Sequence, residues 1–368
     1  MTKKVIAIIS VLKPVDDTRN YEKIARSISN TNKYDINIIG FSTINIPSDQ
    51  NITFLPIFNF KRYHIQRLWA SLKVYKNILK VKPELIIVTT PELLLVSILY
   101  KIIFGAKIIY DIQENYFRNI IYTNSYPIIF RIPIALFIRS LEIVSSLLID
   151  RFILAEKVYL SQMKYLLSRA IIIENKALIP DYIKGMKRSK SKHFVMVYSG
   201  TIANHYGIFT ALDFIKRLKV NVDNIIFVII GFAAQDKIYQ KLKKLTEDLD
   251  YIKIIGGNRL VPHHQILMEM KKANFCLLPY KKNKSTEGRI PTKLYECLAM
   301  EIPVIITPGP AWDSIVQKSN AGIIYDFNSK LDSSPHILHN KYYGKNLSSE
   351  FEWGKQSDKL LEVIHQVL

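Results

Sequence analysis

Cysteine is nearly absent from this sequence, which has only two among its 368 residues, Cys276 and Cys297. A framework of disulfides is therefore not expected, and the composition favours a reducing cytosol. Both cysteines lie inside apolar runs, so we interpret them as buried structural thiols.

Long uncharged apolar runs are missing as well. A helix needs roughly 18 apolar residues to cross a bilayer, and charges at Glu92, Arg131, Arg139 and Glu142 interrupt the best candidates. The N-terminal apolar run is short and stops at a Lys-Pro pair followed by aspartates, which does not fit a signal peptide. We expect a protein that does not cross a membrane, while a position on a membrane surface stays open.

Acidic residues are few relative to basic ones, with 31 Asp and Glu against 51 Lys and Arg and a formal net charge of +20. The excess is spread over both halves of the chain. Such a field suits an anionic small ligand, an anionic membrane surface or nucleic acid. Because the basic residues are dispersed and no recognition motif is present, a nucleic-acid-binding protein is the least favoured of these functions, and we expect no nucleic acid as partner.

Short β-branched runs alternate with helical stretches along the whole chain. A first series begins at residues 5, 35, 85, 106 and 151, and a second begins at 194, 225, 251, 274 and 303. Runs that are apolar on both faces predict parallel sheets covered by helices, so the fold class is α/β with two doubly wound domains. A polar, basic segment near 180–192 marks the boundary. We predict one domain over 1–180, a second over 181–345, and a helix over 346–368 that returns toward the first domain.

Ligands bind beyond the carboxyl ends of parallel strands, which makes the residues after each run the site candidates. After the first run come Asp16, Asp17 and Arg19, at the start of a helix that Thr18 can cap. These residues face an acceptor in one interpretation. In the other, Asp17 and Thr18 only cap the helix and Arg19 pairs with an acid.

Two carboxylates follow the fourth run, Asp111 directly and Glu114 three residues later. A carboxylate at this place can orient a hydroxyl or accept its proton, whereas a loop cap is the alternative. In the second half, Gly200 and Thr201 end a run before a helix, where backbone N–H groups meet phosphate oxygens. Neither G-x-G-x-x-G nor G-x-x-x-x-G-K-[ST] occurs, which counts against a nicotinamide enzyme and a P-loop NTPase.

The segment PTKLYECLAM at 291–300 predicts a helix that begins with proline. Lys293 and Glu296 share one helix face, where such pairs usually form a solvated salt bridge worth ~0.2 to 0.5 kcal/mol. The strand that follows runs into PGPAWDS, a glycine-containing turn that opens another helix and forms a second candidate phosphate loop.

The run PTKLYECLAMEIPVIITPG at 291–309 resembles the donor-binding region of the family 4 retaining glycosyltransferases, in the form seen in bacterial surface-polysaccharide enzymes such as those of O-antigen or capsule synthesis. KPVDDTR at 13–19 and the segment from PELLLVS to GAKIIYDIQENY at 91–116 are similar to the same group. The resemblance implies a GT-B fold, with two facing Rossmann-like domains and a central cleft. It also implies that the C-terminal domain binds a nucleotide sugar and the N-terminal domain the acceptor, with retention at the anomeric carbon.

The resemblance assigns roles to single residues. Glu296 matches the glutamate that grips the ribose hydroxyls, Gly200 and Thr201 match the loop near the diphosphate, and Gly309 with Pro310 matches the second loop. Three departures are present. Glu287 stands one residue before the usual position of the first glutamate, Arg289 or Lys293 has to supply the positive charge missing after the first loop, and Gln113 replaces the histidine of the acceptor side.

No metal is expected, because H-E-x-x-H, cysteine pairs and dense aspartate clusters are missing from the donor half. His263 and His264 are adjacent, so they point apart on a helix. The nucleotide sugar is then a co-substrate, and helix N-termini with Arg or Lys neutralise the departing nucleoside diphosphate.

The segment 60–82 is basic and contains no acid. Its apolar residues form one helical stripe, which either rests on anionic lipid or is buried against the sheet. The predicted membrane contacts are Arg62, Trp69, Lys73, Lys76 and Lys80. The apolar region 126–150 is a candidate to help hold a lipid-borne acceptor.

The sequence therefore predicts a cytoplasmic glycosyltransferase that is peripheral on the inner face of the cell membrane. It moves a sugar from a nucleotide-sugar donor to a lipid-linked saccharide, with Asp111, Glu114 and Glu287 as candidate catalytic residues. A nucleotide-sugar epimerase of the same fold is the alternative.

Overall fold

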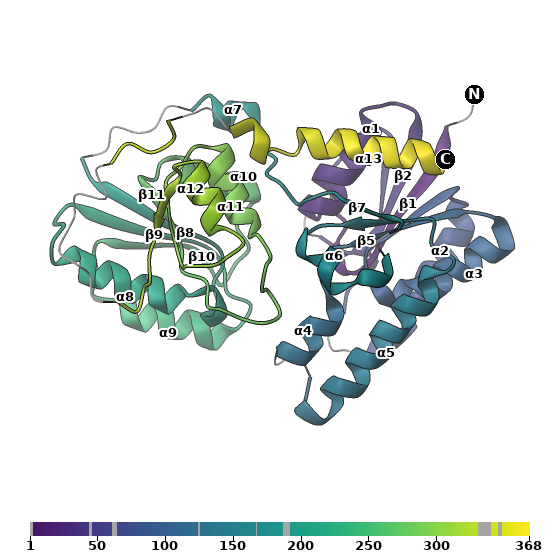
Figure 1. Ribbon diagram of the computed structural model, residues 1–368, viewed down its shortest axis with the longest axis horizontal. Helices are drawn as coiled ribbons and strands as arrows, with labels where there is room; N and C mark the ends of the chain where they lie inside the picture. The colour runs from purple at the N-terminus through teal and green to yellow at the C-terminus, as the bar shows by residue number, and fades with distance from the viewer. Residues whose placement is uncertain are drawn as a thin grey trace. The chain divides into compact units, whose positions relative to one another are not determined.

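The computed structural model describes residues 3–43, 46–60, 65–123, 126–166, 168–186, 192–329, 340–344 and 348–368. The chain forms two compact units. The N-terminal unit consists of Met1–Asn175, Lys284–Thr286 and Trp353–Leu368, and the C-terminal unit of Lys176–Asn283 and Glu287–Glu352. Figure 1 shows that each unit has its own sheet with its own helices.

The N-terminal unit is built on a sheet of seven parallel strands in the order β3-β2-β1-β4-β5-β6-β7. Its strands are rich in Ile and Val, and all four residues of β4 are buried, as expected for a sheet covered on both faces. The strands are β1 (Lys4–Pro14), β2 (Tyr34–Phe41), β3 (Ile52–Phe58), β4 (Leu85–Val88), β5 (Lys107–Ile112), β6 (Arg151–Leu154) and β7 (Ala170–Ile172).

Helices cover both faces of this sheet. One face carries the π-helix η1 (Thr18–Ala25), α1 (Arg26–Ser29) and α13 (Gly354–Val367), which contact one another. The other face carries α2 (Ala70–Val81), α3 (Leu94–Phe104) and α5 (Ile128–Ser146). Shorter elements connect them: 3-10 turns η2 (Ile65–Trp69), η3 (Pro91–Leu93) and η4 (Lys164–Leu166), and helices α4 (Tyr116–Tyr122) and α6 (Val158–Gln162).

The C-terminal unit has a second parallel sheet, in the order β10-β9-β8-β11-β12-β13. Its strands are β8 (Phe194–Thr201), β9 (Ile225–Phe232), β10 (Ile252–Gly257), β11 (Phe275–Leu278), β12 (Val304–Ile306) and β13 (Gly322–Ile324). Its helices are α7 (Asp181–Lys184), α8 (Ile208–Lys219), α9 (Asp236–Thr246), α10 (His263–Lys271), α11 (Thr292–Ala299) and α12 (Asp313–Lys318), with 3-10 turns η5 (Asn204–Tyr206) and η7 (Ser348–Phe351).

Both sheets reverse their strand order beside the first strand of the unit, between β1 and β4 and between β8 and β11. In doubly wound sheets such a reversal opens a crevice at the carboxyl ends of the strands, where ligands bind. The α/β fold class that the sequence predicts is confirmed in both units. Each unit therefore has one place where its fold favours a site.

Three strands of the structure are missing from the sequence prediction: β3, β7 and β13. β3 contains Pro56, which lacks an N–H donor and is tolerated because β3 is an edge strand. Cys276 and Cys297 are buried free thiols, as predicted. Among the described helices, none combines the length and apolarity that crossing a bilayer requires.

The last segment of the chain completes the N-terminal unit. The indole Nε1 of Trp353 donates a hydrogen bond to Ser27 Oγ at 2.9 Å, and Leu360, Val363 and Ile364 of α13 are buried. An amphipathic helix gains most of its stability from burying such a face.

We expect Leu360→Ala to lower the free energy of unfolding of the N-terminal unit by about 2 to 5 kcal/mol, since it leaves a cavity under α13. Urea denaturation followed by circular dichroism measures the change. Glu362→Ala, at an exposed position of the same helix, is the matched control and should be nearly neutral. Equal stability of the two variants would contradict the docking of α13.

Candidate active site

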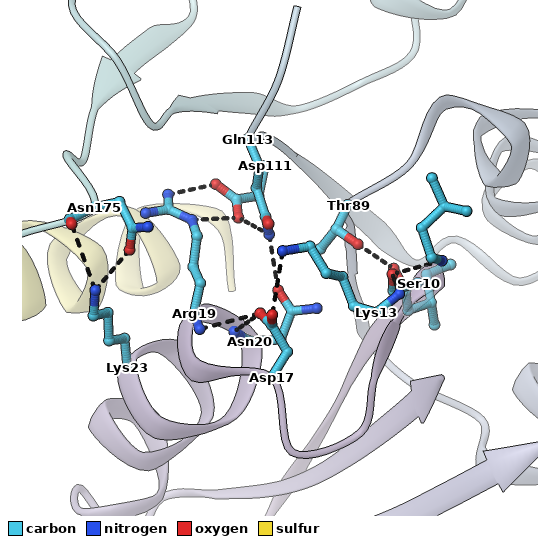
Figure 2. Close-up of polar contacts among 12 residues, drawn as sticks. Ser10, Lys13, Asp17, Arg19, Asn20, Lys23, Thr89, Asp111, Gln113 and Asn175 are labelled. Atoms are coloured by element: carbon cyan, nitrogen blue, oxygen red, sulfur yellow. Dashed lines mark hydrogen bonds and ion pairs between the residues drawn. The ribbon is translucent and has the colours of Figure 1, made fainter. Parts of the chain in front are cut away.

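A buried ion pair lies at the carboxyl end of the N-terminal sheet, between Arg19 of η1 and Asp111 of β5 (Figure 2). Arg19 Nε donates to Asp111 Oδ2 at 2.9 Å, and Nη2 donates to Oδ1 at 2.6 Å. Nη2 also donates to the carbonyl of Ile173 at 3.1 Å. Two parallel bonds of this kind fix both position and orientation of the guanidinium.

Asp111 is enclosed by its partners. Its exposed fraction is 0%, and Oδ2 accepts a further hydrogen bond from Gln113 Nε2 at 2.9 Å. Gln113 Nε2 also donates to Asn20 Oδ1 at 2.8 Å, which ties the β5 end to η1. The carboxylate of Asp111 therefore balances a buried charge in this structure, and its catalytic role stays a prediction.

Arg19 keeps its charge at this buried position. Burial lowers its pKa, but the charge of Asp111 and the hydrogen bonds to it more than offset that effect and raise the pKa above its ordinary value. Arg19 Nη1 is buried without a hydrogen-bond partner. It is therefore a donor at the strand ends that the protein itself does not satisfy.

Asp17 caps η1, one of the two residues for which the sequence predicts this role. Its Oδ1 accepts from the backbone N–H groups of Arg19 and Asn20, both at 3.1 Å. Its Oδ2 lies 3.2 Å from Lys13 Nζ. The charge of Asp17 raises the pKa of Lys13, burial opposes that rise, and Glu114 adds to it, so a lysine cation is held between two acids.

The remaining acceptor-side candidates lie around this pair. Asp16 and Glu114 are partly exposed. Asp16 Oδ2 accepts from Thr43 Oγ1, and Glu114 Oε2 accepts from Asn119 Nδ2, both at 2.6 Å. The structure thus gathers Asp16, Asp17, Arg19 and Glu114 at one edge of the N-terminal sheet.

The donor-side candidates lie at the reversal of the C-terminal sheet. Gly200 is the next-to-last residue of β8 and has a φ of +105°, and a Cβ built there would lie 3.3 Å from Lys293 Cε. The stem of Lys293 therefore lies over bare backbone, where the absence of a side chain at Gly200 makes the close approach possible. Thr201 follows as an exposed residue at the end of the strand.

Glu296 is the centre of a buried charged cluster in α11. Its Oε2 accepts from Lys293 Nζ at 2.6 Å, and its Oε1 lies 3.0 Å from His263 Nε2. Glu296 is only 2% exposed, so the pair with Lys293 is buried and not a solvated pair. Both oxygens of this carboxylate thus have a partner within the protein.

The pKa of Glu296 reflects these partners. Burial alone raises the pKa of this carboxyl group, but the charge of Lys293 and the hydrogen bond and charge of His263 outweigh burial and lower it to about 2. Glu296 is therefore ionised at neutral pH and ready to accept hydrogen bonds.

Four further donor-side candidates differ in the groups that they offer to a ligand. Gly309 N–H already donates to Asp313 Oδ1 at 2.9 Å, and Pro310 has no N–H, so these two residues provide no backbone donor to phosphate. A Cβ at Gly309 would overlap the indole of Trp312, which is the structural reason for glycine there. Glu287 is exposed and Arg289 is partly buried, both in the turn before α11.

Residues that the sequence analysis missed also join the two clusters. His263 contacts Glu296, and Lys281 Nζ donates to Asn204 Oδ1 at 2.9 Å in the loop after β8. Lys13 lies beside Asp17. Lys13 lies at the carboxyl end of β1, and His263 and Lys281 lie in the segments after β10 and β11, so a search of the strand ends and the segments after them would have selected all three. Among the described residues, no group of three or more His, Cys, Asp and Glu is placed to hold a metal ion.

The predicted membrane contacts lie on η2 and α2, except Arg62, which is outside the described residues. Trp69 is 62% exposed, and Lys73, Lys76 and Lys80 are exposed. The side chains that α2 buries are Ala70, Val74 and Ile78. Of the predicted stripe, Trp69, Leu72 and Leu79 are exposed and Tyr75 packs against the core, so the stripe is not buried as a whole.

A family model described as "Glycosyl transferases group 1" matches residues 182–338. The match spans β8, the cluster at Glu296 and the turn at Gly309. This part of the chain is thus similar to the group 1 glycosyltransferases, and it is the part with the donor-side candidates. No match to the sequence was found among curated proteins.

Solved structures are similar over almost the whole chain. Sucrose-phosphate synthase from Thermosynechococcus elongatus has a TM-score of 0.73 at 14% identity, with 99% of each chain covered. HepE of Anabaena in complex with UDP has a TM-score of 0.60 at 13% identity, and the match covers 99% of this chain and 100% of that chain. A protein described as a UDP-N-acetylglucosamine 2-epimerase from Listeria monocytogenes has a TM-score of 0.58 at 10% identity. The match covers 99% of this chain and 96% of that chain. Identities this low show the fold alone, and the predicted GT-B fold class is confirmed.

We expect Asp111→Asn to reduce the free energy of unfolding by about 3 to 5 kcal/mol, because Arg19 then stays buried without a counter-charge. Glu114→Gln serves as the control, since it removes a charge from a partly exposed side chain and should cost less than about 1 kcal/mol. Guanidinium denaturation of both variants measures the difference. A neutral Asp111→Asn would rule out a structural ion pair.

Glu296 should make stability depend on pH. Its folded pKa of about 2 lies below the ordinary 4.5, so its contribution is fully present above about pH 4.5 and is lost as the pH falls toward 2. The shift corresponds to roughly 3 kcal/mol. We expect Glu296→Gln to be less stable than wild type at pH 7 and to lose less stability than wild type between pH 5 and pH 3, measured by urea denaturation. Parallel losses in both proteins would contradict the assignment.

Proposed function

We propose that the protein transfers a sugar from a nucleotide-sugar donor to a lipid-linked saccharide acceptor, with retention of the anomeric configuration. The observation that carries the proposal is the cluster of Gly200, Lys293 and Glu296, which lies inside the segment that matches the glycosyltransferase model. We further propose a cytoplasmic location on the inner face of the cell membrane and a role in surface-polysaccharide synthesis, as in the family 4 enzymes that the sequence resembles.

The donor's nucleoside is assigned to Glu296. An ionised, buried carboxylate is a strong acceptor for two adjacent hydroxyl groups, which is the chemistry that a ribose offers. In the structure, Lys293 and His263 hold the two carboxylate oxygens in place. His263 acts here as a positioning residue, because it fixes the orientation of the group that binds.

The donor's diphosphate is assigned to the end of β8 and to Lys293. The side chain of Lys293 lies beside Gly200, so it can exchange its contact with Glu296 for a phosphate oxygen when the ribose arrives. The N-terminus of α8, which has no side-chain cap, and Arg289 add positive potential. Negative charge that develops on the departing nucleoside diphosphate is stabilised by these groups, without a step that requires a metal.

The acceptor is assigned to the N-terminal unit. Glu114 and Asp16 are partly exposed and can orient hydroxyl groups, while Lys13 can donate to an anionic or hydroxyl group. Nη1 of Arg19 is buried and unpartnered, so it is a further donor for a group that reaches the strand ends. Asp111 has a positioning role in this proposal, since it holds Arg19. Glu287 remains the candidate for a contact with the donor sugar.

A nucleotide-sugar epimerase is the second candidate, favoured by the similarity to the Listeria monocytogenes structure. The two activities differ in what they need. An epimerase changes the sugar without an acceptor, whereas a transferase leaves the nucleotide sugar intact until an acceptor is added. Chromatography of nucleotide sugars incubated with the protein alone separates these two functions.

We expect isothermal titration to show binding of at least one of UDP, GDP and ADP, and Glu296→Ala to weaken that binding by roughly tenfold or more, the size of a lost charge-assisted hydrogen bond. Glu247→Ala, at an exposed carboxylate of the same unit, is the control and should bind as wild type does. Binding of none of the nucleotides would end the proposal, and unchanged affinity of Glu296→Ala would remove the role given to Glu296.

A further inference from the structure

Helix α5 buries polar side chains and exposes apolar ones, the opposite of an ordinary surface helix. Its buried side chains include Glu142, Ser145 and Ser146, while the opposite side is apolar and exposed. That side carries a stripe at helical spacing, formed by Ile129, Ile132, Leu136 and Ile143. Ile129 is 72% exposed and Leu136 is 54% exposed. A helix between a sheet and water normally turns its apolar side to the sheet.

Polar contacts hold α5 in this orientation. Glu142 Oε1 accepts from Tyr110 Oη at 3.0 Å, and its Oε2 accepts from Tyr165 Oη at 3.3 Å and lies 3.3 Å from Arg139 Nη1. Burial raises the pKa of Glu142, which Arg139 and the two tyrosines oppose. A satisfied buried network of this kind specifies one arrangement. The apolar stripe therefore faces outward because the polar side is anchored inward.

The neighbouring helices continue the apolar surface. α3 contacts both α2 and α5, and it exposes Leu95, Leu99, Ile102 and Ile103. On η2 and α2, Trp69, Leu72 and Leu79 are exposed. We call the exposed apolar side chains of η2, α2, α3 and α5 the apolar face. Contiguous exposure of this extent marks an interaction surface.

The apolar face is bordered by positive charge. The only carboxylate in α2, α3 and α5 is Glu142, which is buried, whereas Lys73, Lys76 and Lys80 of α2 are exposed. A pocket of about 540 Å³ adjoins α2 and α3 at the amino ends of β1, β4 and β5. Leu79 and Phe104 line it together with Glu84 and three lysines, Lys4, Lys82 and Lys107.

We propose that the apolar face rests in the head-group layer of an anionic lipid bilayer, with the lysines of α2 and of the pocket contacting lipid phosphate. Apolar side chains beside lysines, with no exposed acid on α2, α3 or α5, match the boundary between acyl chains and anionic head groups. A second copy of the chain fits less well, because an isologous contact would bring the same lysines together without carboxylates to balance them.

This inference rests on the proposed function for its purpose, since a lipid-linked acceptor is found at a membrane surface. It extends the membrane contact predicted on 60–82 to α3 and α5, and it makes α5 the main apolar element. The N-terminal unit, which is assigned the acceptor, is then the unit that is attached to the bilayer.

Flotation of the full chain with vesicles tests the inference. We expect wild type to float with vesicles of phosphatidylcholine containing about one third phosphatidylglycerol, and far less with phosphatidylcholine alone. Ile129→Asp/Leu136→Asp should lower the bound fraction by roughly tenfold or more, because two charges then enter the apolar layer. Val220→Asp/Leu260→Asp, two exposed apolar residues of the C-terminal unit, is the matched control and should float as wild type does.

The cationic border has its own variant. Lys73→Gln/Lys76→Gln/Lys80→Gln should weaken binding to the anionic vesicles and reduce its dependence on salt. Absence of wild-type flotation, or equal flotation of wild type and Ile129→Asp/Leu136→Asp, overturns the inference. A dimer in light scattering that Ile129→Asp/Leu136→Asp disrupts, without vesicle binding by wild type, would assign the apolar face to a second copy instead.

The same samples separate this inference from the proposed function. Ile129→Asp/Leu136→Asp should keep the nucleotide affinity of wild type, and Glu296→Ala should keep its flotation. If no nucleotide binds but flotation follows the apolar face, the proposed function fails and the bilayer contact stands. If nucleotides bind and wild type does not float, the reverse holds.

Discussion

The carboxyl edge of the N-terminal sheet depends on the ion pair between Arg19 and Asp111. It joins the helix after β1 to the end of β5, and through Ile173 it reaches the segment after β7. Two charges that are buried together are costly to desolvate, and they stabilise a structure only when their geometry is good and their other donors are satisfied. Here the pair is bidentate and Gln113 adds a third donor to Asp111, while Nη1 of Arg19 stays without a partner. The pair therefore fixes the strand ends in one arrangement that can present Lys13, Asp16 and Glu114, and one buried donor remains for a ligand.

The donor side also has a buried carboxylate paired with a cation, but there the cation can leave the carboxylate more easily. Glu296 is buried between Lys293 and His263, but one of its partners is a lysine on a flexible stem beside a glycine. The planar guanidinium of Arg19 forms two bonds to Asp111 that are both lost if the side chain rotates. The ammonium group of a lysine has no such fixed geometry and exchanges partners easily. One buried carboxylate therefore belongs to the scaffold and the other is suited to binding.

Much of the fold follows from the sequence, because runs such as LIIV at 85–88 are apolar on both faces and can only lie inside a covered parallel sheet. The strands that escape prediction are β7 and β13, which are three residues long, and β3, which contains Pro56. In the site, the carboxyl-end rule finds Arg19 and Asp111. It does not show that they bind each other, since 92 positions separate them and only the strand order brings them together.

The spacing of apolar residues alone does not determine which side of a helix faces the sheet. On α2 both sides carry apolar residues, and the small set Ala70, Val74 and Ile78 faces the sheet while Trp69, Leu72 and Leu79 face outward. On α5 the decision is made by Glu142, whose partners Tyr110 and Tyr165 come from other elements. The sequence pattern predicts that a helix has an apolar stripe. The position of polar partners on other elements then determines whether that stripe faces the sheet or the solvent.

The two thiols have a consequence of a different kind. Cys276 on β11 and Cys297 on α11 are both buried in the core of the C-terminal unit, and burial raises the pKa of Cys297 well above its ordinary value. A protonated, enclosed thiol does not react with an alkylating reagent until the surrounding structure opens. The rate at which these cysteines are modified under native conditions thus measures how often β11 and α11 separate. Because α11 contains Glu296, this rate reports on the local stability of the donor-side cluster.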